Sequence, residues 1–238
     1  MSGLSFGAYG GHTMTSDPRE LAAAAVAFAK PRLRGWLHTV TAPLALAAGI
    51  VLIALAPTGE AAGAAAAFSA SAVLLFTTSA IYHRGHWSER VERHLKRLDH
   101  ANIFFLIAGT YTPFAVLALS GETRIAVLAA VWGTAIGGAL FRVLWVGAPR
   151  WSYVPLYLGL GWAAAFVVPQ LIRGVGEAAF TLIAVGGACY TVGGVIYGLK
   201  RPNPSPRWFG FHEVFHTLTI AGFICQYIAA SFVVYRAV

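Results

Sequence analysis

The stretch GFHEVFHTLTIAGFICQYIAASFVVY, residues 210–235, decides the fold of this chain. Beyond its first turns it is apolar, and it is longer than the roughly 20 residues that an α-helix needs to cross a bilayer. It also opens with two histidines, His212 and His216, at a spacing of four. Polar side chains at the mouth of a membrane helix are costly, so this pair is a candidate functional site.

Comparable apolar stretches fill the rest of the chain. With 58% hydrophobic and 11% charged residues, the 238-residue chain carries too little charge to cover a soluble domain. We therefore predict an all-α fold, a bundle of seven transmembrane helices. The predicted spans are residues 36–56, 62–83, 98–119, 124–145, 151–172, 178–199 and 210–235.

Lysine and arginine residues fall mostly on one side of these spans. Fourteen of the 17 lie in the N-terminal segment and in the second, fourth and sixth connectors. The positive-inside rule then predicts a cytoplasmic N-terminus and an outer C-terminus, as in a multi-pass protein of the inner (plasma) membrane. Because the basic residues are spread over short loops, the net charge of +8 does not indicate a nucleic-acid partner. Cys189 and Cys225 both lie within spans, which excludes a disulfide framework.

The chain divides into two predicted parts. Residues 1–35 form a cytoplasmic segment, and residues 36–238 form the transmembrane domain. In the first part, Asp17 can be an N-cap, Pro18 fits the first helical position, and Glu20 can complete a capping box. We therefore expect a short cytoplasmic helix ahead of the first span.

Two features modify the predicted spans. Favourable Glu–basic pairs at i,i+4 spacing follow Ser88, so the third span is expected to begin there as a water-exposed helix. Three prolines also lie within spans, at Pro113, Pro155 and Pro169. In a membrane, neighbouring side chains can satisfy the backbone groups that such prolines free.

Polar residues from distant parts of the sequence meet at one level in this topology. His83 ends the second span and Asp99 begins the third, near the cytoplasmic face where His212 and His216 also lie. Two histidines four apart project from one helix face, the spacing at which one helix gives two ligands to zinc. His83 could supply a third ligand and leave an open position for water, as in catalytic zinc sites. Asp99 could orient or deprotonate that water, and Ser79 could hydrogen-bond a developing oxyanion or hold a ligand in its rotamer.

Other interpretations of the same residues remain open. Alone, His83 could be an interfacial histidine, Asp99 could cap or pair locally, and Ser79 could bond its own helix. The pattern H-E-x-x-H at residues 212–216 also occurs in zinc proteases, where Glu213 would be the base. A serine-hydrolase triad of Ser79, His83 and Asp99 would leave the final two histidines without a role. The remaining histidines are interpreted as terminal, interfacial or loop residues: His12, His38, His86, His94 and His100.

Five motifs, in this order, cover nearly the whole chain: KPRLRGWLH at 30–38, SAIYH at 79–83, LDHANI at 98–103, GTYTPF at 109–114 and FHEVFH at 211–216. Together they resemble the hemolysin III-like bacterial branch of the progestin and adipoQ receptor family. The resemblance implies seven helices with a cytoplasmic N-terminus and a zinc ion held by His83, His212 and His216. It also implies that Asp99 lies near the zinc water, with Ser79 beside it.

The wider superfamily includes adiponectin receptors and alkaline ceramidases, so the resemblance implies hydrolysis of a lipid amide and a role in membrane-lipid homeostasis. Our leading hypothesis is a zinc-dependent intramembrane hydrolase of a lipid amide or ester, with membrane lipids as partners. One alternative is a receptor or membrane-stress sensor with structural zinc. A protease and a pore-forming cytolysin are further alternatives. The pore-forming cytolysin is disfavoured because no continuous polar stripe lines the spans. The oligomeric state is left open.

Overall fold

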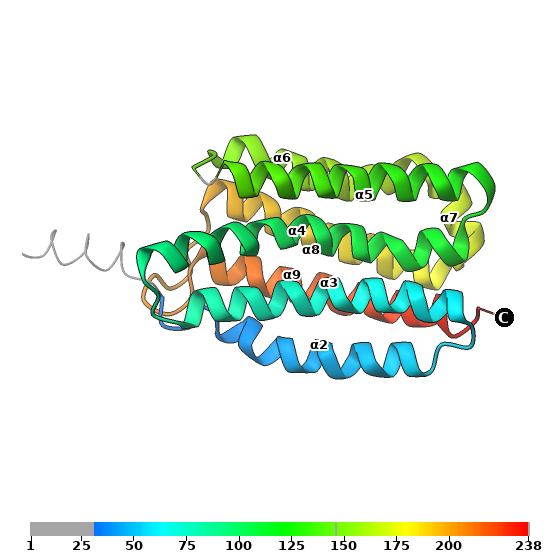
Figure 1. Cartoon of the computed structure of the whole chain (residues 1–238), viewed down its shortest axis with the longest axis horizontal. Coiled ribbons are helices and arrows are strands. Elements are labelled where there is room, and N and C mark those ends of the chain that lie inside the picture. The colour runs from blue at the N-terminus through cyan, green and yellow to red at the C-terminus, as the bar shows by residue number, and fades with distance from the viewer. Residues whose placement is uncertain (1–30, 146, 238) are drawn as a thin grey trace, which may run out of the picture.

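The structure is a computed structural model that describes residues 31–145 and 147–237. Within these residues it is all-helical, and seven helical stretches are long and apolar enough to cross a membrane, which confirms the predicted fold class (Figure 1). The elements are α2 (Trp36–Ala54), α3 (Gly59–Arg84), α4 (Glu89–Ala118), α5 (Gly121–Leu144), α6 (Arg150–Gly161), the 3-10 helix η1 (Trp162–Val167), α7 (Val168–Val175), α8 (Glu177–Leu199) and α9 (Phe211–Val234).

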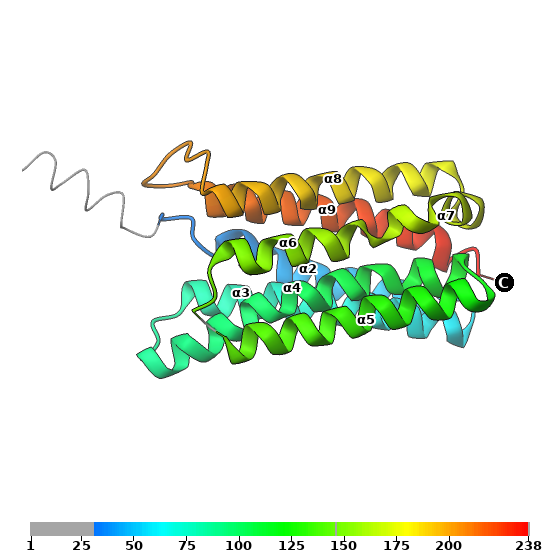
Figure 2. The same ribbon diagram turned by 90° about the horizontal axis from the view of Figure 1, so that it is seen from above.

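The helices run side by side along the long axis of the molecule, and their connections gather at its two ends (Figure 1). The α3–α4 and α8–α9 connections lie at the same end as residue 31, and the C-terminus lies at the other (Figures 1 and 2). Helix α9 is central, since it packs against α2, α3, α4 and α8. The first turns of α9 are therefore within reach of the end of α3 and the start of α4.

Local sequence explains where the second and third spans begin. At α3, the Thr58 side chain caps the helix by accepting a hydrogen bond from the Ala61 amide at 3.2 Å. Helix α4 begins directly after Ser88, as predicted, and its first turns project beyond the neighbouring helices (Figure 2). Glu89 and Arg93 form the expected exposed i,i+4 pair at 3.7 Å. The span is therefore one long helix with a polar first part.

The fifth span differs from the prediction, because it is not one continuous helix over 151–172. It is divided into α6, η1 and α7, and Pro169 occupies the start of α7. Proline has no amide hydrogen to donate to the preceding turn, which favours a break at this point. The Tyr111 hydroxyl of α4 bridges two backbone groups at this break. It donates to the Gly161 carbonyl at 2.7 Å and accepts from the Ala164 amide at 2.8 Å.

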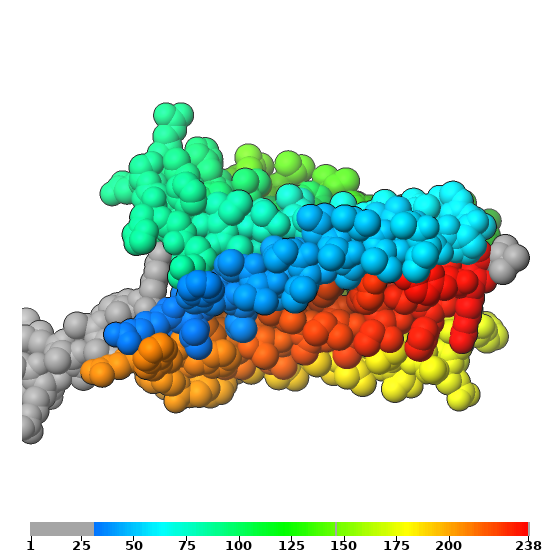
Figure 3. Space-filling view, turned by 90° about the horizontal axis from the view of Figure 1, so that it is seen from below, coloured from blue at the N-terminus to red at the C-terminus, as the bar shows by residue number. Residues whose placement is uncertain are grey.

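Large apolar side chains cover the outside of the bundle, as a lipid-facing surface requires. Phe166, Leu144 and Trp151 are 89%, 81% and 77% exposed. The interior is filled by small residues and phenylalanines, among them Phe68, Phe76 and Phe104, which are fully buried. The face made by α2, α3, α9 and α8 is a closed surface of side-by-side helices (Figure 3).

Two predictions fall outside what this structure tests. The short helix expected after Asp17 lies outside the described residues. The division of the chain at residue 35 and the cytoplasmic placement of the N-terminus stay predictions.

Candidate metal centre

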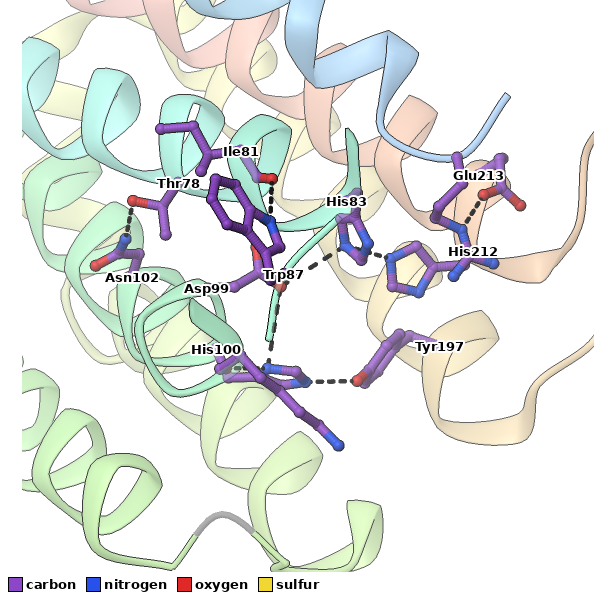
Figure 4. Close-up of polar contacts among 12 residues, drawn as sticks. Thr78, Ile81, His83, Trp87, Asp99, His100, Asn102, Tyr197, His212 and Glu213 are labelled. Carbon is purple, nitrogen blue, oxygen red and sulfur yellow. Dashed lines mark hydrogen bonds and ion pairs between the residues drawn. The ribbon is translucent and has the colours of Figure 1, made fainter. Parts of the chain in front are cut away.

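Three histidines converge at the end of the bundle where α3 ends and α9 begins. His83 lies in the last turn of α3, and His212 and His216 lie in the first two turns of α9. One ring nitrogen from each histidine lies within 4.8 Å of the others. The Nε2 atoms of His83 and His212 are 3.1 Å apart, and Figure 4 shows these two ring nitrogens directed toward each other. The predicted histidine cluster is therefore present.

This donor set fits a metal ion. In a tetrahedral site with Zn–N bonds of about 2.0–2.1 Å, two ligand nitrogens lie roughly 3.3 Å apart. The separation of 3.1 Å between His83 and His212 is close to that value. His212 and His216 are also buried, which keeps competing water away from them. Three imidazoles leave one tetrahedral position open, the arrangement of a catalytic rather than a closed structural site.

Asp99 and Ser79 lie beside the histidine cluster. Asp99 is in the third turn of α4, and Ser79 is about one turn before the end of α3. The Asp99 carboxylate Oδ2 is 3.8 Å from His83 Nε2, and Figure 4 shows both side chains directed toward the same point. Ser79 is 2% exposed and lies against the Asp99 carboxylate. Close to these residues in the sequence, the Asn102 amide donates to the Thr78 hydroxyl at 3.0 Å, and this hydrogen bond joins α4 to α3. The five residues selected from the sequence thus come together.

His100 was predicted to be interfacial or in a loop, and this is wrong. It is 7% exposed and lies at the centre of a hydrogen-bonded network between α4, α6 and α8. Its Nδ1 is 2.7 Å from the Lys96 carbonyl and its Nε2 is 2.9 Å from the Tyr197 hydroxyl. The Tyr157 hydroxyl donates to the His100 carbonyl at 2.9 Å. The His100 ring is thus held at both nitrogens, and its main chain is held at the carbonyl.

The direction of this network follows from its chemistry. A carbonyl can only accept, so His100 Nδ1 carries the hydrogen that it donates to Lys96. In the neutral ring Nε2 is then an acceptor, and the Tyr197 hydroxyl must donate to it. Tyr197 in turn accepts from the Tyr153 hydroxyl, 3.3 Å away. The orientation and tautomer of the His100 side chain are therefore both set. Because His100 directly follows Asp99, these contacts restrict rotation of α4 at the site.

His38 was also predicted to be interfacial, and it too is buried, at 2% exposure. Its ring stacks on His216 with centroids 3.8 Å apart and planes 10° from parallel. It also makes an edge-to-face contact with Phe76, with ring centroids 5.0 Å apart. His38 thus fixes the plane of one of the three clustered histidines. A sequence shows that His38 starts a span but not toward which neighbour it points.

The residues just before α2 enclose the centre. Gly35 has a left-handed φ of 83°, and a Cβ at this position would lie 2.8 Å from the Cβ of His83. Glycine is therefore required both by the backbone and by the close approach. The amides of Arg32 and Leu33 donate to the carbonyls of Arg207 and Trp208 at 2.9 and 3.2 Å. Figure 3 shows this segment lying against the α8–α9 connection.

Glu213, between the two α9 histidines, is held in place on both oxygens. It is 1% exposed, forms an ion pair with Arg34, and accepts from the Gly210 amide at 2.8 Å as the N3 residue of a capping box. These contacts give the glutamate of the H-E-x-x-H pattern a structural role. They do not favour the protease interpretation, in which it would be a base.

Comparison with known proteins shows the family of this chain. A sequence model of the haemolysin-III-related family matches residues 26–227, which include every residue of the centre described above. This chain belongs to the haemolysin-III-related family, within the progestin and adipoQ receptor family. It is similar to Hemolysin-3 of Bacillus cereus, with 31% identity over 200 residues, or 83% of this chain and 88% of the relative. It is also 30% identical to the Hemolysin-3 homolog of Bacillus subtilis strain 168 over 166 residues, 69% and 74% of the two chains.

In this haemolysin-III-related protein the histidine cluster lies at the head of a cavity of about 330 Å³. Ser79, Asp99 and His212 line its polar end, and Ala115 and Leu171 line the part near the opposite end of the bundle. The 16 residue steps along α4 from Asp99 to Ala115 correspond to roughly 24 Å of helix. The wall between these ends is mostly apolar. The cavity is therefore long, apolar and capped by the candidate metal centre.

Proposed function

We propose that this protein is a zinc-dependent intramembrane hydrolase of a lipid amide or ester. The observation that carries the proposal is the position of the polar centre. Three clustered histidines, with Asp99 and Ser79 beside them, meet a cavity that is long and apolar enough for an acyl chain. A lipid bound in this cavity would place its chain among the helices and its carbonyl at the polar end.

Zinc held by His83, His212 and His216 would supply Lewis acidity that polarises a carbonyl and makes water a better nucleophile. Asp99 then has the role of a proton carrier. Its carboxylate takes a proton as water adds to the carbonyl carbon, and returns it to the leaving nitrogen or oxygen as the C–N or C–O bond breaks. The products are a fatty acid and an amine or alcohol.

Ser79 contributes through its hydroxyl, which can donate a hydrogen bond to the carbonyl oxygen as negative charge develops there. His38 and the His100 network have an indirect, positioning role. They hold the His216 ring and the start of α4 so that donor atoms and carboxylate keep their relative positions. Such fixed geometry reduces the reorganisation that the reaction would otherwise require.

The asymmetry of lysine and arginine supports a cytoplasmic location for the site in the inner membrane. The centre lies at the end of the bundle that carries the α3–α4 and α8–α9 connections, which are rich in basic residues. By the positive-inside rule this end faces the cytoplasm. The scissile bond would then lie at the headgroup level of the inner leaflet.

Incubation of the purified protein with total lipid extract, with and without a zinc chelator, tests this function. We expect chelator-sensitive release of fatty acids, detected by mass spectrometry, in the wild type. Asp99→Asn should retain zinc and lose most of the release, by about 100-fold or more. Glu177→Gln, which alters an exposed carboxylate on α8, is the matched control and should behave like the wild type. Release that persists unchanged in Asp99→Asn would remove the proposed proton carrier.

A non-enzymatic sensor with structural zinc is the second candidate, and one observation favours it. The histidine cluster joins α3 to α9, two helices far apart in the sequence, at a buried position. A metal there would stabilise the bundle whether or not a lipid is cleaved. This candidate predicts a lower thermal midpoint after zinc removal, together with no fatty-acid release under any condition.

A further inference from the structure

Leu119 lies at the end of the cavity that is farthest from the metal centre. It directly follows α4, at the end of the bundle opposite the histidine cluster (Figure 1). The 20 residue steps from Asp99 to Leu119 correspond to roughly 30 Å of helix, about the thickness of the hydrocarbon core of a bilayer. Of the described residues around α4 that line the cavity, Leu119 is the last. The cavity therefore runs nearly the whole length of the bundle.

A separate polar groove lies on the other side of Leu119. Polar side chains from the α4–α5 connection, the start of α5 and α7 line it: Ser120, Thr123, Gln170 and Arg173. Leu119 lines the groove as well, and among the described residues it is the only one that lines both the groove and the cavity. One apolar residue thus separates the space for an acyl chain from a polar surface.

The backbone of the α4–α5 connection directs the leucine side chain inward. Leu119 and Ser120 are both extended, with ψ of 157° and 167°, and consecutive side chains of an extended chain point to opposite sides. Accordingly, Leu119 is 7% exposed, whereas Ser120 is an exposed residue. Beside them α7 approaches α4 closely, since a Cβ added to Gly174 would lie 2.2 Å from the Ala118 carbonyl oxygen. This close approach leaves the Leu119 side chain as the boundary between the two spaces.

We propose that Leu119 sets the length of the longest acyl chain that the cavity accepts. An extended chain advances about 1.2 Å per bond, so a chain that begins beside Asp99 and ends against Leu119 has roughly 20 to 25 carbons. A longer chain must displace the leucine side chain or place methylene groups in the polar groove, and both are unfavourable. The presence of an acyl chain in the cavity rests on the proposed function, but its binding requires no turnover.

Leu119 can be changed without removing a side chain from the packed core beside it. Phe114 and Leu171 also line the far part of the cavity, but they belong to the hydrophobic cluster that joins α4, α7, α8 and α9. Among the described residues, Leu119 is not a member of that cluster. Substitutions at Leu119 should therefore alter the length of the cavity more than the packing of the helices.

Competition among fatty acids of different length tests this role. Purified, delipidated protein in detergent micelles is mixed with equal amounts of saturated fatty acids whose lengths span the expected limit in steps of two carbons. Native mass spectrometry counts the bound species. Leu119→Ala removes three side-chain carbons and should raise the limit by about two to four carbons, whereas Leu119→Phe should lower it by about two. A general loss of stability cannot produce shifts in opposite directions, and either shift is sufficient if the other variant does not fold.

Leu55→Ala is the matched control and should keep the wild-type length profile. Leu55 also directly follows a helix at this end of the bundle, but it is 62% exposed and is not among the described residues that line the cavity. The same profile in the wild type and in both Leu119 variants would overturn the proposal, and so would a wild type that binds no fatty acid. A limit that moves with residue 119, without lipid hydrolysis, would support the role of Leu119 and contradict the hydrolase. Hydrolysis with an unchanged profile would do the reverse.

Discussion

Arg34 and Glu213, which are 179 residues apart in the chain, form an ion pair that fastens the residues before α2 to the first turn of α9. Glu213 is 1% and Arg34 is 18% exposed at the side chain. The pair lies directly beside His212, and the same segment continues into Gly35 against His83 and His38 against His216. A single stretch of five residues thus contacts or neighbours every histidine of the cluster.

Arg34→Met should therefore weaken both the fold and the metal centre. It leaves a buried carboxylate without its cation, and we expect a loss of about 2 kcal/mol in the free energy of unfolding together with weaker zinc binding. Arg93→Met breaks the exposed pair with Glu89 and is the control, with an expected change below about 0.5 kcal/mol. Thermal midpoints and zinc content measure both effects.

Glu213→Gln separates the structural role from the protease role. The variant should lose stability and zinc together, because the ion pair that positions α9 is weakened. A variant with wild-type stability and full zinc but no turnover would instead identify Glu213 as a base, and would contradict our interpretation of the capping box and ion pair.

Substitutions at His38 test the stacking contact with His216. His38→Phe keeps a flat ring against His216 and should retain most zinc affinity, whereas His38→Ala removes the ring and should lower it by roughly tenfold. His94→Ala changes an exposed histidine of α4 and should have no effect. If His38→Phe lost zinc as completely as His38→Ala, a ring nitrogen rather than the stack would be required.

Tyr197→Phe tests the network around His100. The change removes the donor to His100 Nε2 and the acceptor for Tyr153, at distances of 2.9 and 3.3 Å. We expect a loss of about 1–3 kcal/mol in stability, since a buried acceptor is left unsatisfied. Zinc content should be unchanged and turnover reduced, because His100 adjoins Asp99 and not the ligands. Tyr235→Phe, at a residue 40% exposed, is the control. Unaltered turnover would show that the network does not position Asp99.

Tyr111→Phe should loosen the break in the fifth span. Without the hydroxyl, the Gly161 carbonyl and the Ala164 amide lose their bridge. We expect faster hydrogen exchange confined to η1 and the ends of α6 and α7, with the exchange of α2 and α3 unchanged. Equal protection of η1 in the variant and the wild type would contradict a bridging role for Tyr111.

The sequence predicted the parts of the site that depend on span ends. His83, Asp99 and His212 each lie where a span meets the same face of the membrane, so counting residues and charges was sufficient to bring them to one level. It could not predict the roles of His38 and His100. Those depend on the rotation of α2 and α4 about their axes, which packing against His216 and Tyr197 decides.

The break in the fifth span shows a similar limit. Pro113 and Pro155 lie inside continuous helices, whereas Pro169 follows a 3-10 segment. The three prolines look alike in the sequence, and each lies within an apolar stretch. Pro169 differs because the Tyr111 hydroxyl bridges the Gly161 carbonyl and the Ala164 amide in the irregular segment before it. That bridge comes from another helix, so local sequence does not reveal it.

Zinc content is the most direct test of the central claim that His83, His212 and His216 hold one metal ion. Protein purified without chelators, and freed of any affinity tag, is analysed by plasma mass spectrometry. We predict about one zinc per chain in the wild type and in His94→Ala, and almost none in His83→Ala or His216→Ala. Folded wild-type protein without zinc, or full zinc content in the two histidine variants, would contradict the account.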